Sequence, residues 1–252
     1  MPPCKWHEIL QILRVFFSVF LLYSLLHWHL LNCIMFALEP VVHLKTGAVL
    51  YREALWRPLG KNHPVGPMLQ AVNSLGLMKT LDFAMAAEVR DFVLNSQIDS
   101  RIGLNLEPQT VIEHGDGILC LLGSALRGIV IEITERGDPA FLADAAFRRF
   151  LERSCETGAL VALDDLGEGL YADYAQVISE FRPAFIKADK ARIEVLTHAK
   201  SFGASCIAEK IETQKDLAAA IDAGAQYGQG YLFTEKEREA SRDLRGFCAA
   251  LV

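Results

Sequence analysis

From about residue 36 onward, short runs rich in Val, Ile and Leu alternate with longer segments of helical periodicity. This alternation is typical of repeated βα units, in which each buried strand is followed by a helix that covers it. Eight such units close most simply into a (β/α)₈ TIM-type barrel. The expected strands are residues 36–42, 49–55, 102–106, 129–134, 160–165, 184–188, 205–209 and 226–232.

The first connection departs from the repeat. Only Lys45-Thr46-Gly47-Ala48 separates the first two strands, which is too short for a helix and suits a hairpin turn. We therefore expect a modified barrel whose first strand pair is antiparallel. Segments 140–158 and 213–224 are amphipathic, and the second ends in Gly224, as a helix C-cap does.

Composition narrows the class of protein. Hydrophobic residues make up 52% of the chain and charged residues 22%, which is enough apolar material for a large core. The formal charge is −6 and no run of basic residues occurs, so we expect no duplex nucleic acid partner. The six cysteines are widely spaced and form no CxxC pair, which favours free thiols in a reducing cytosol.

The amino end has a different character. Residues 15–38 contain no Asp, Glu, Lys or Arg, and a membrane-spanning helix needs only about 20 mostly apolar residues. We therefore divide the chain into a hydrophobic segment, 1–34, and a barrel domain, 35–252. Three interpretations of the segment stay open: a membrane anchor or in-plane helix over residues 9–34, a helix packed under the barrel, or a true start at Met35.

Polar side chains stand near the ends of nearly all the expected strands. In a TIM barrel these ends meet at one mouth, where the active site lies. Carboxylates gathered there repel one another unless cations compensate them, and an all-oxygen donor set without His or Cys suits Mg²⁺ or Mn²⁺ better than Zn²⁺. The residues concerned are Glu53, Asn105, Glu132, Asp164, Asp165, Lys187, Glu209 and Gln229.

Lys187 is the one expected cation among these acids. A lysine in this position can hold or orient a water while it stays charged against the carboxylates. Two hard cations on either side of a water are the usual apparatus for hydrolysing a phosphodiester.

The motifs resemble those of the EAL domain, the cyclic di-GMP phosphodiesterase family of bacteria, over about residues 36–235. The resemblance rests on seven stretches in the family's order. They are Glu53-Ala54-Leu55 with Arg57, Asn105 in IGLNL, IEITE at 131–135, DDLGEG at 164–169, IKAD at 186–189, AEKIET at 208–213, and Gln229-Gly230-Tyr231.

The resemblance implies a role for each matching residue. Glu53, Asn105, Glu132 and Asp164 would hold one metal ion, and Asp164, Asp165 and Glu209 the second. Lys187 would contact the attacking water, and Glu209 would serve as the general base. Substrate contacts are implied for Arg57, Gln229 and Glu39, and supporting roles for Glu135, which braces a loop in this family, and Glu212.

The chain also departs from the family pattern. Glu39 precedes Pro40 where the family usually has Gln, which adds a negative charge beside an anionic substrate. Leu166, Glu168 and Leu170 are unusual in the loop after the two aspartates, and Lys210 stands where glycine is common. None of these changes removes an expected metal ligand.

The resemblance thus implies an enzyme that hydrolyses cyclic di-GMP to linear pGpG with two Mg²⁺ or Mn²⁺ ions. The alternative is a catalytically weak or inactive module of the same fold that binds cyclic di-GMP or a protein partner. A third interpretation, an unrelated Mg²⁺-dependent barrel enzyme, requires the motif match to be accidental. A cytoplasmic barrel, a homodimer and association with the inner membrane are further expectations.

Overall fold

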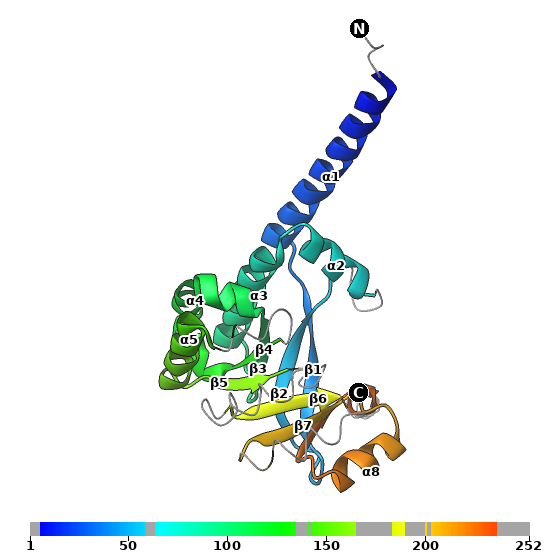
Figure 1. Cartoon of the computed structure of the whole chain (residues 1–252). Helices are drawn as coiled ribbons and strands as arrows, with labels where there is room; N and C mark the ends of the chain where they lie inside the picture. The colour runs from blue at the N-terminus through cyan, green and yellow to red at the C-terminus, as the bar shows by residue number, and fades with distance from the viewer. Residues whose placement is uncertain are drawn as a thin grey trace, which may run out of the picture.

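A computed structural model describes residues 6–58, 64–134, 141, 143–164, 183–189, 200 and 203–235, with side chains from residue 17 onward. Its eight strands form a closed barrel in the order β1 to β8 (Figure 1). The strands are β1 Phe36–His43, β2 Val49–Trp56, β3 Arg101–Leu106, β4 Ile129–Ile133, β5 Leu160–Leu163, β6 Phe185–Asp189, β7 Ser205–Glu209 and β8 Tyr227–Gln229. The (β/α)₈ prediction is therefore confirmed.

Strand β1 runs against its two neighbours. It pairs antiparallel with β2 and with β8, whereas every pair from β2–β3 to β7–β8 is parallel. The hairpin predicted at residues 45–48 makes this reversal, because Gly47 adopts φ +72° in its turn. The modified first connection is thus confirmed.

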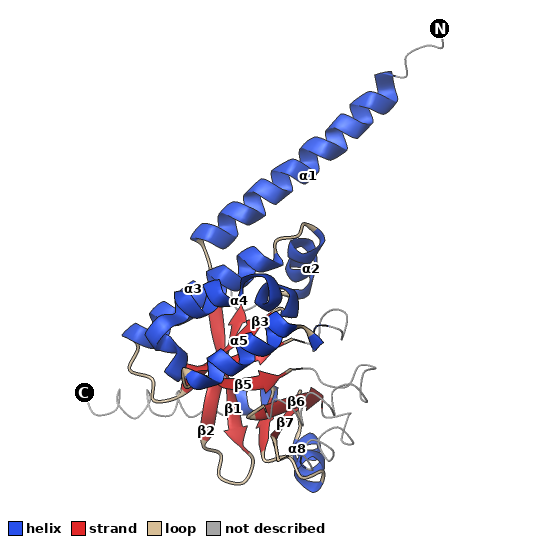
Figure 2. Cartoon of the chain, turned by 60° about the vertical axis from the view of Figure 1, so that its left-hand side comes forward, coloured by secondary structure: helices blue, strands red, loops and turns tan. Residues whose placement is uncertain are grey.

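The described helices lie outside the barrel (Figures 1 and 2). Helices α3, α4 and α5 pack side by side, and α8 lies at the far end of the molecule from α1, Trp6–Asn32. A capping box between Thr213 and Asp216 starts α8, and Gly224, at φ +87°, follows its end as predicted. Besides α1, the helices among the described residues are α2 Gly66–Ser74, α3 Met78–Asn95, α4 Pro108–Leu122, the short 3₁₀ helix η1 Gly123–Gly128, α5 Ala145–Glu156 and α8 Gln214–Asp222.

Two separate hydrophobic clusters of described residues hold the barrel together. The larger one lies between the outer face of the strands and the helices. The smaller one fills the barrel interior and consists of Val41, Tyr51, Val130, Ala162, Phe185 and Ile207. Side chains alternate along a strand, so the residues two positions further toward the carboxyl ends of the parallel strands also point inward. Those positions hold the polar residues of the mouth.

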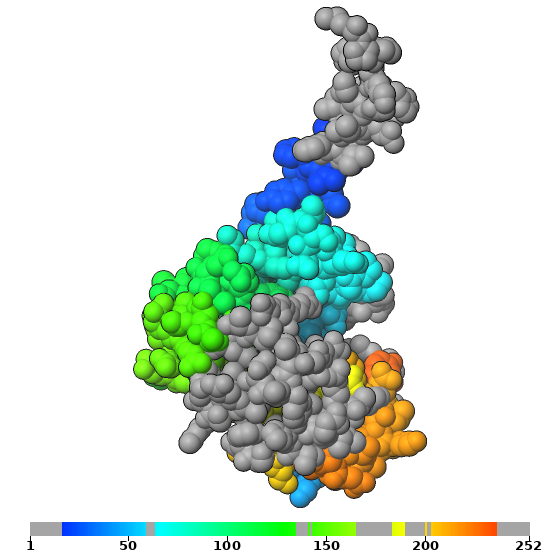
Figure 3. Space-filling model, viewed as in Figure 1, coloured from blue at the N-terminus to red at the C-terminus, as the bar shows by residue number. Residues whose placement is uncertain are grey.

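Helix α1, Trp6–Asn32, projects from the barrel (Figures 1 and 3). Near its carboxyl end, Leu26 and Leu30 are buried in the large cluster, and α1 contacts α3. Phe17, Phe20 and Trp28 are more than half exposed. In the part of the chain whose side chains are described, no helix has the length and apolar character needed to cross a membrane. Residues 9–16 of the anchor predicted over 9–34 lie outside that part.

The end of the last strand differs from the prediction. Strand β8 stops at Gln229 instead of continuing to residue 232. Gly230 adopts φ +146°, and a Cβ there would collide with the backbone of Ile211. A close approach between two backbone segments therefore ends the strand early.

Candidate active site

The predicted mouth residues come together in three dimensions. Glu53, Glu132, Lys187 and Glu209 lie on four different strands, and Asp164 directly follows β5. Asn105 on β3 lies level with Glu132 on β4 in the parallel register. Strands that are far apart in the sequence thus present their polar ends to one small volume.

Lys187 lies at the centre of this cluster. Its ammonium Nζ is 2.6 Å from Glu132 Oε2, 3.1 Å from Glu53 Oε2, and 3.0 Å from both Asp164 Oδ1 and Glu209 Oε1. The side chain is fully buried. Burial favours the neutral amine, but the four carboxylates outweigh it and raise the pKa of Lys187 well above its usual value. The lysine is therefore a fixed positive charge.

Glu53 is held from three sides. Asn105 Nδ2 donates to Oε1 and Gln229 Nε2 donates to Oε2, each at 2.6 Å, while Lys187 contacts Oε2. Burial favours the protonated acid, but the Lys187 charge and these hydrogen bonds prevail and lower the pKa of Glu53. The structure thus presents an ionised, oriented carboxylate.

The pKa of Glu132 is shifted in the opposite direction from that of Glu53. It is completely buried, and burial together with the charge of Glu53 raises its pKa well above the usual value despite the contact with Lys187. Its second oxygen, Oε1, is buried without a hydrogen-bond partner among the described residues. A buried acceptor without a donor is costly, so this oxygen is suited to receive a cation.

The cluster fits a hard divalent metal ion. Glu53, Glu132 and Asp164 each offer a carboxylate oxygen, and these oxygens all lie within 4.8 Å of one another. Oxygen-only donor sets suit hard divalent cations better than Zn²⁺. Among the described residues, this is the one group of three or more potential acidic, His or Cys ligands.

Glu39 brings another carboxylate to the edge of the cluster. It is half-buried on β1, directly opposite Glu53 on β2. Burial and the charge of Glu53 raise its pKa, while Lys187, Arg57 and a hydrogen bond with Gln229 act in the opposite direction. Arg57 donates through Nη1 to the carbonyl of Trp56 at 2.9 Å. The departure noted in the sequence therefore borders the metal-ligand candidates.

Three further residues singled out in the sequence have different outcomes. Asp165 and Glu135 lie outside the described residues, as does the loop with Leu166, Glu168 and Leu170. Glu212 is exposed, and its backbone N–H donates to Asp216 Oδ2 at 3.1 Å. Its supporting role stays a prediction.

The comparison with protein families agrees with this geometry. The sequence profile of the EAL domain matches residues 31–236, which is most of the chain. The chain belongs to the EAL domain family.

Two curated relatives are named as cyclic di-GMP phosphodiesterases, one of them as probable. Cyclic di-GMP phosphodiesterase PdeL of Escherichia coli (strain K12) is 26% identical over 223 residues, which cover 78% of this chain and 60% of PdeL. The probable cyclic di-GMP phosphodiesterase PdeB of the same organism is 26% identical over 222 residues, which cover 78% of this chain and 41% of PdeB. This EAL domain chain therefore spans less than two thirds of either relative.

Solved structures agree on the fold. The Xanthomonas citri FimX EAL domain, crystallised in complex with c-di-GMP, superposes with a TM-score of 0.67 at 18% identity. The match covers 84% of this chain and 92% of that one. At this identity the likeness establishes the EAL barrel fold alone.

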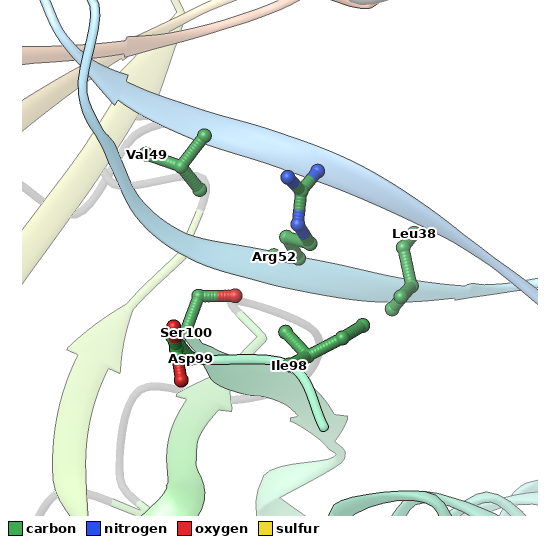
Figure 4. A pocket seen from close by; sticks show the side chains of 6 residues that line it. All are labelled: Leu38, Val49, Arg52, Ile98, Asp99 and Ser100. Carbon is green, nitrogen blue, oxygen red and sulfur yellow. The ribbon is translucent and has the colours of Figure 1, made fainter. Parts of the chain in front are cut away.

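A separate cavity of the EAL barrel is lined by Leu38, Val49, Arg52, Ile98, Asp99 and Ser100 (Figure 4). That cavity, of about 580 Å³, lies between β1, β2 and the segment that precedes β3. Arg52 lines it, and Arg52 faces outward because it alternates with the inward-facing Tyr51 and Glu53. None of the residues that line this cavity belongs to the cluster around Lys187.

Three residues of this EAL domain carry features that sequence reasoning missed or only partly noted. Tyr51 and Gly103 lie directly beneath the carboxylates, and the alternation counted back from Glu53 and Asn105 is the signal that finds them. Lys210 adopts φ +56°, which explains why a glycine suits this position, and its Nζ pairs with Asp189 Oδ2 at 2.8 Å.

Proposed function

We propose that this EAL domain is a metal-dependent phosphodiesterase that hydrolyses cyclic di-GMP to linear pGpG through two-metal activation of water. The observation that carries the proposal is the cluster around Lys187. This positively charged lysine is enclosed by Glu53, Glu132, Asp164 and Glu209 at the mouth of the barrel. The names of the two curated relatives support the substrate.

The ligands of the two metal ions follow from the donor set and the family resemblance. Glu53, Asn105, Glu132 and Asp164 would hold one Mg²⁺ or Mn²⁺ ion, and Asp164, Asp165 and Glu209 the other. Such ions, when bound, supply an acidic water and neutralise charge on the attacked phosphate.

Two side chains of the protein would act on the attacking water, one as a base for its proton and one as a positive charge. Glu209 Oε1 lies 3.0 Å from Lys187 Nζ, so a water beside this ion pair can contact a base and a fixed positive charge at once. We propose that Glu209 accepts the proton of the attacking water while Lys187 orients it. The water oxygen bonds to phosphorus and the bond from phosphorus to the ribose 3′ oxygen breaks. The proton that Glu209 accepted passes to that 3′ oxygen, which leaves as a hydroxyl, and Glu209 is again a carboxylate.

Substrate contacts come from the edge of the cluster. Arg57 supplies a guanidinium that suits a phosphate oxygen. Gln229 donates a hydrogen bond to Glu53 and so keeps that carboxylate in place. It also forms a hydrogen bond with Glu39. Glu39 adds a negative charge, which we expect to weaken binding of the dianionic substrate.

The experiment is to incubate the full chain with cyclic di-GMP and Mn²⁺ and to follow pGpG by chromatography. Glu53→Gln should abolish product formation while circular dichroism stays that of the wild type. Glu152→Gln, at an exposed position on α5, is the matched control and should act as the wild type. Product from Glu53→Gln at the wild-type rate would refute the mechanism.

Glu39 favours one second candidate, a module that binds cyclic di-GMP without hydrolysing it. Its carboxylate adds to a cluster that already holds four, and excess negative charge opposes approach of a phosphate. Retention of cyclic di-GMP with no pGpG at any Mn²⁺ concentration would favour this candidate.

A further inference from the structure

Gly103 occupies an unusual place in the barrel. It lies on β3 two residues before Asn105, level with Glu53 on β2 and with Val130 on β4. By the alternation of the strand it faces the barrel interior, one inward position below Asn105 and its register partner Glu132. The other members of that layer, such as Tyr51, Val130 and Phe185, fill space, whereas Gly103 leaves space open.

The open space is taken by the tail of Glu132. A Cβ built on Gly103 would overlap Glu132 Oε1 and would lie 3.2 Å from Glu132 Cδ. It would also lie 3.0 Å from Tyr51 Cε2. Glu132 Oε1 therefore rests where any other residue at position 103 would put its side chain.

The carboxylate has little freedom to move elsewhere. Glu132 is completely buried, and its Oε2 is held at 2.6 Å by Lys187. The Tyr51 ring, also completely buried, closes the far side of the gap and packs against Phe185 with ring centroids 5.7 Å apart. In a close-packed interior, an added methyl group must displace one of these groups, and the terminal carboxylate yields first.

We propose that Gly103 is a positioning residue whose missing side chain sets where the Glu132 carboxylate lies and thereby makes Glu132 a metal ligand. The inference rests on the proposed function, because it assumes that the cluster binds a divalent cation. Gly103 has no side chain to offer a metal or a substrate, so it acts through Glu132 alone.

Gly103→Ala tests the inference in the full chain, with Mn²⁺ affinity measured by titration calorimetry and no substrate present. We expect Mn²⁺ to bind about tenfold or more weakly, the effect that losing the support of a metal ligand commonly has. Gly128→Ala is the matched control: a Cβ there would lie 2.7 Å from Val93 Cγ1, but at the opposite end of β4. It should also crowd a neighbouring side chain, although less closely, and leave Mn²⁺ affinity unchanged.

Glu132→Asp separates positioning from general damage. The shorter side chain withdraws the carboxylate from Gly103, so the methyl group then meets no carboxylate. Gly103→Ala should therefore weaken Mn²⁺ binding by less than about threefold when Glu132→Asp is already present. If Gly103→Ala alone does not fold, Glu132→Asp should restore folding, since the two groups compete for one space.

Each outcome of these experiments either supports or overturns the inference. Equal Mn²⁺ affinity for Gly103→Ala and the wild type overturns the inference, and so do equal losses in the presence and absence of Glu132→Asp or a failure of Glu132→Asp to restore folding. A wild type that binds Mn²⁺ and obeys this pattern, but makes no pGpG, refutes the proposed function and leaves the inference standing. A wild type that binds no Mn²⁺ refutes both.

Discussion

The ammonium of Lys187 lies 2.6 Å from Glu132 Oε2, and neither side chain has a solvent-exposed surface above 1%. Removing two charges from water is costly, and the cost is offset only when each finds a good partner. Here one ammonium serves Glu132 and three further carboxylates, so it compensates only part of their charge. The remaining negative charge is what a divalent cation would neutralise.

Lys187→Met should therefore destabilise the metal-free protein by about 3–5 kcal/mol, the usual cost of leaving buried charges without their partner. Mn²⁺ should recover part of this loss, because a cation can replace the ammonium among the acids. Urea unfolding in chelator and in Mn²⁺ measures both effects. Lys79→Met, at an exposed position on α3, should change little. A Lys187→Met protein as stable as the wild type in chelator would contradict the charge balance described here.

Tyr51→Phe should leave stability unchanged or raise it by up to about 1 kcal/mol. The Tyr51 hydroxyl is buried without a hydrogen-bond partner among the described residues, so removing it removes a desolvation cost. Tyr51→Ala should cost about 3–5 kcal/mol, because it opens a cavity beside Phe185. Urea midpoints compare the two. A loss above 1 kcal/mol in Tyr51→Phe would mean that the hydroxyl has a hydrogen-bond acceptor after all.

Glu39→Gln should tighten binding of cyclic di-GMP severalfold, since it removes one negative charge directly opposite Glu53. Under turnover, KM should fall more than kcat changes. Glu113→Gln, at an exposed position on α4, is the control and should leave KM as it is. Weaker binding by Glu39→Gln would show that this carboxylate contacts the ligand or its cation favourably.

Cys206 should resist alkylation in the native protein. Burial raises the pKa of its thiol to about 11, although the Lys200 charge acts in the opposite direction. At pH 8 the thiol is protonated and inaccessible, whereas Cys120 is exposed and should react first. Mass mapping after iodoacetamide treatment measures this order.

The same thiol makes stability depend on pH. Because its native pKa exceeds the unfolded value near 9, its contribution to stability is complete below pH 9 and is lost as the pH rises through about 11. Cys206→Ala should show a smaller loss of stability between pH 8 and pH 11 than the wild type. Equal losses in both proteins would contradict the raised pKa.

The sequence by itself determined the strands, the hairpin and the polar ends of the strands, because these depend on local patterns. Short apolar runs rich in Val, Ile and Leu predict β3 and β4, whose side chains alternate with a period of two, and a four-residue connection with Gly47 predicts the reversal before β2. The inward direction of Glu53 and Asn105 follows from the same period of two.

Only the tertiary structure decided which residues far apart in the sequence come into contact and how each contact shifts the pKa or the position of a side chain. Closure of the barrel brings Lys187 to Glu53 across 134 residues of sequence, and Gln229 to Glu53 across 176. It also makes Glu53 and Glu132 differ: the first keeps a lowered pKa because three donors surround it, and the second has a raised pKa because burial and Glu53 oppose its charge. The space that Gly103 leaves for Glu132 has the same origin, since packing and electrostatics at short range depend on distances that no local pattern contains.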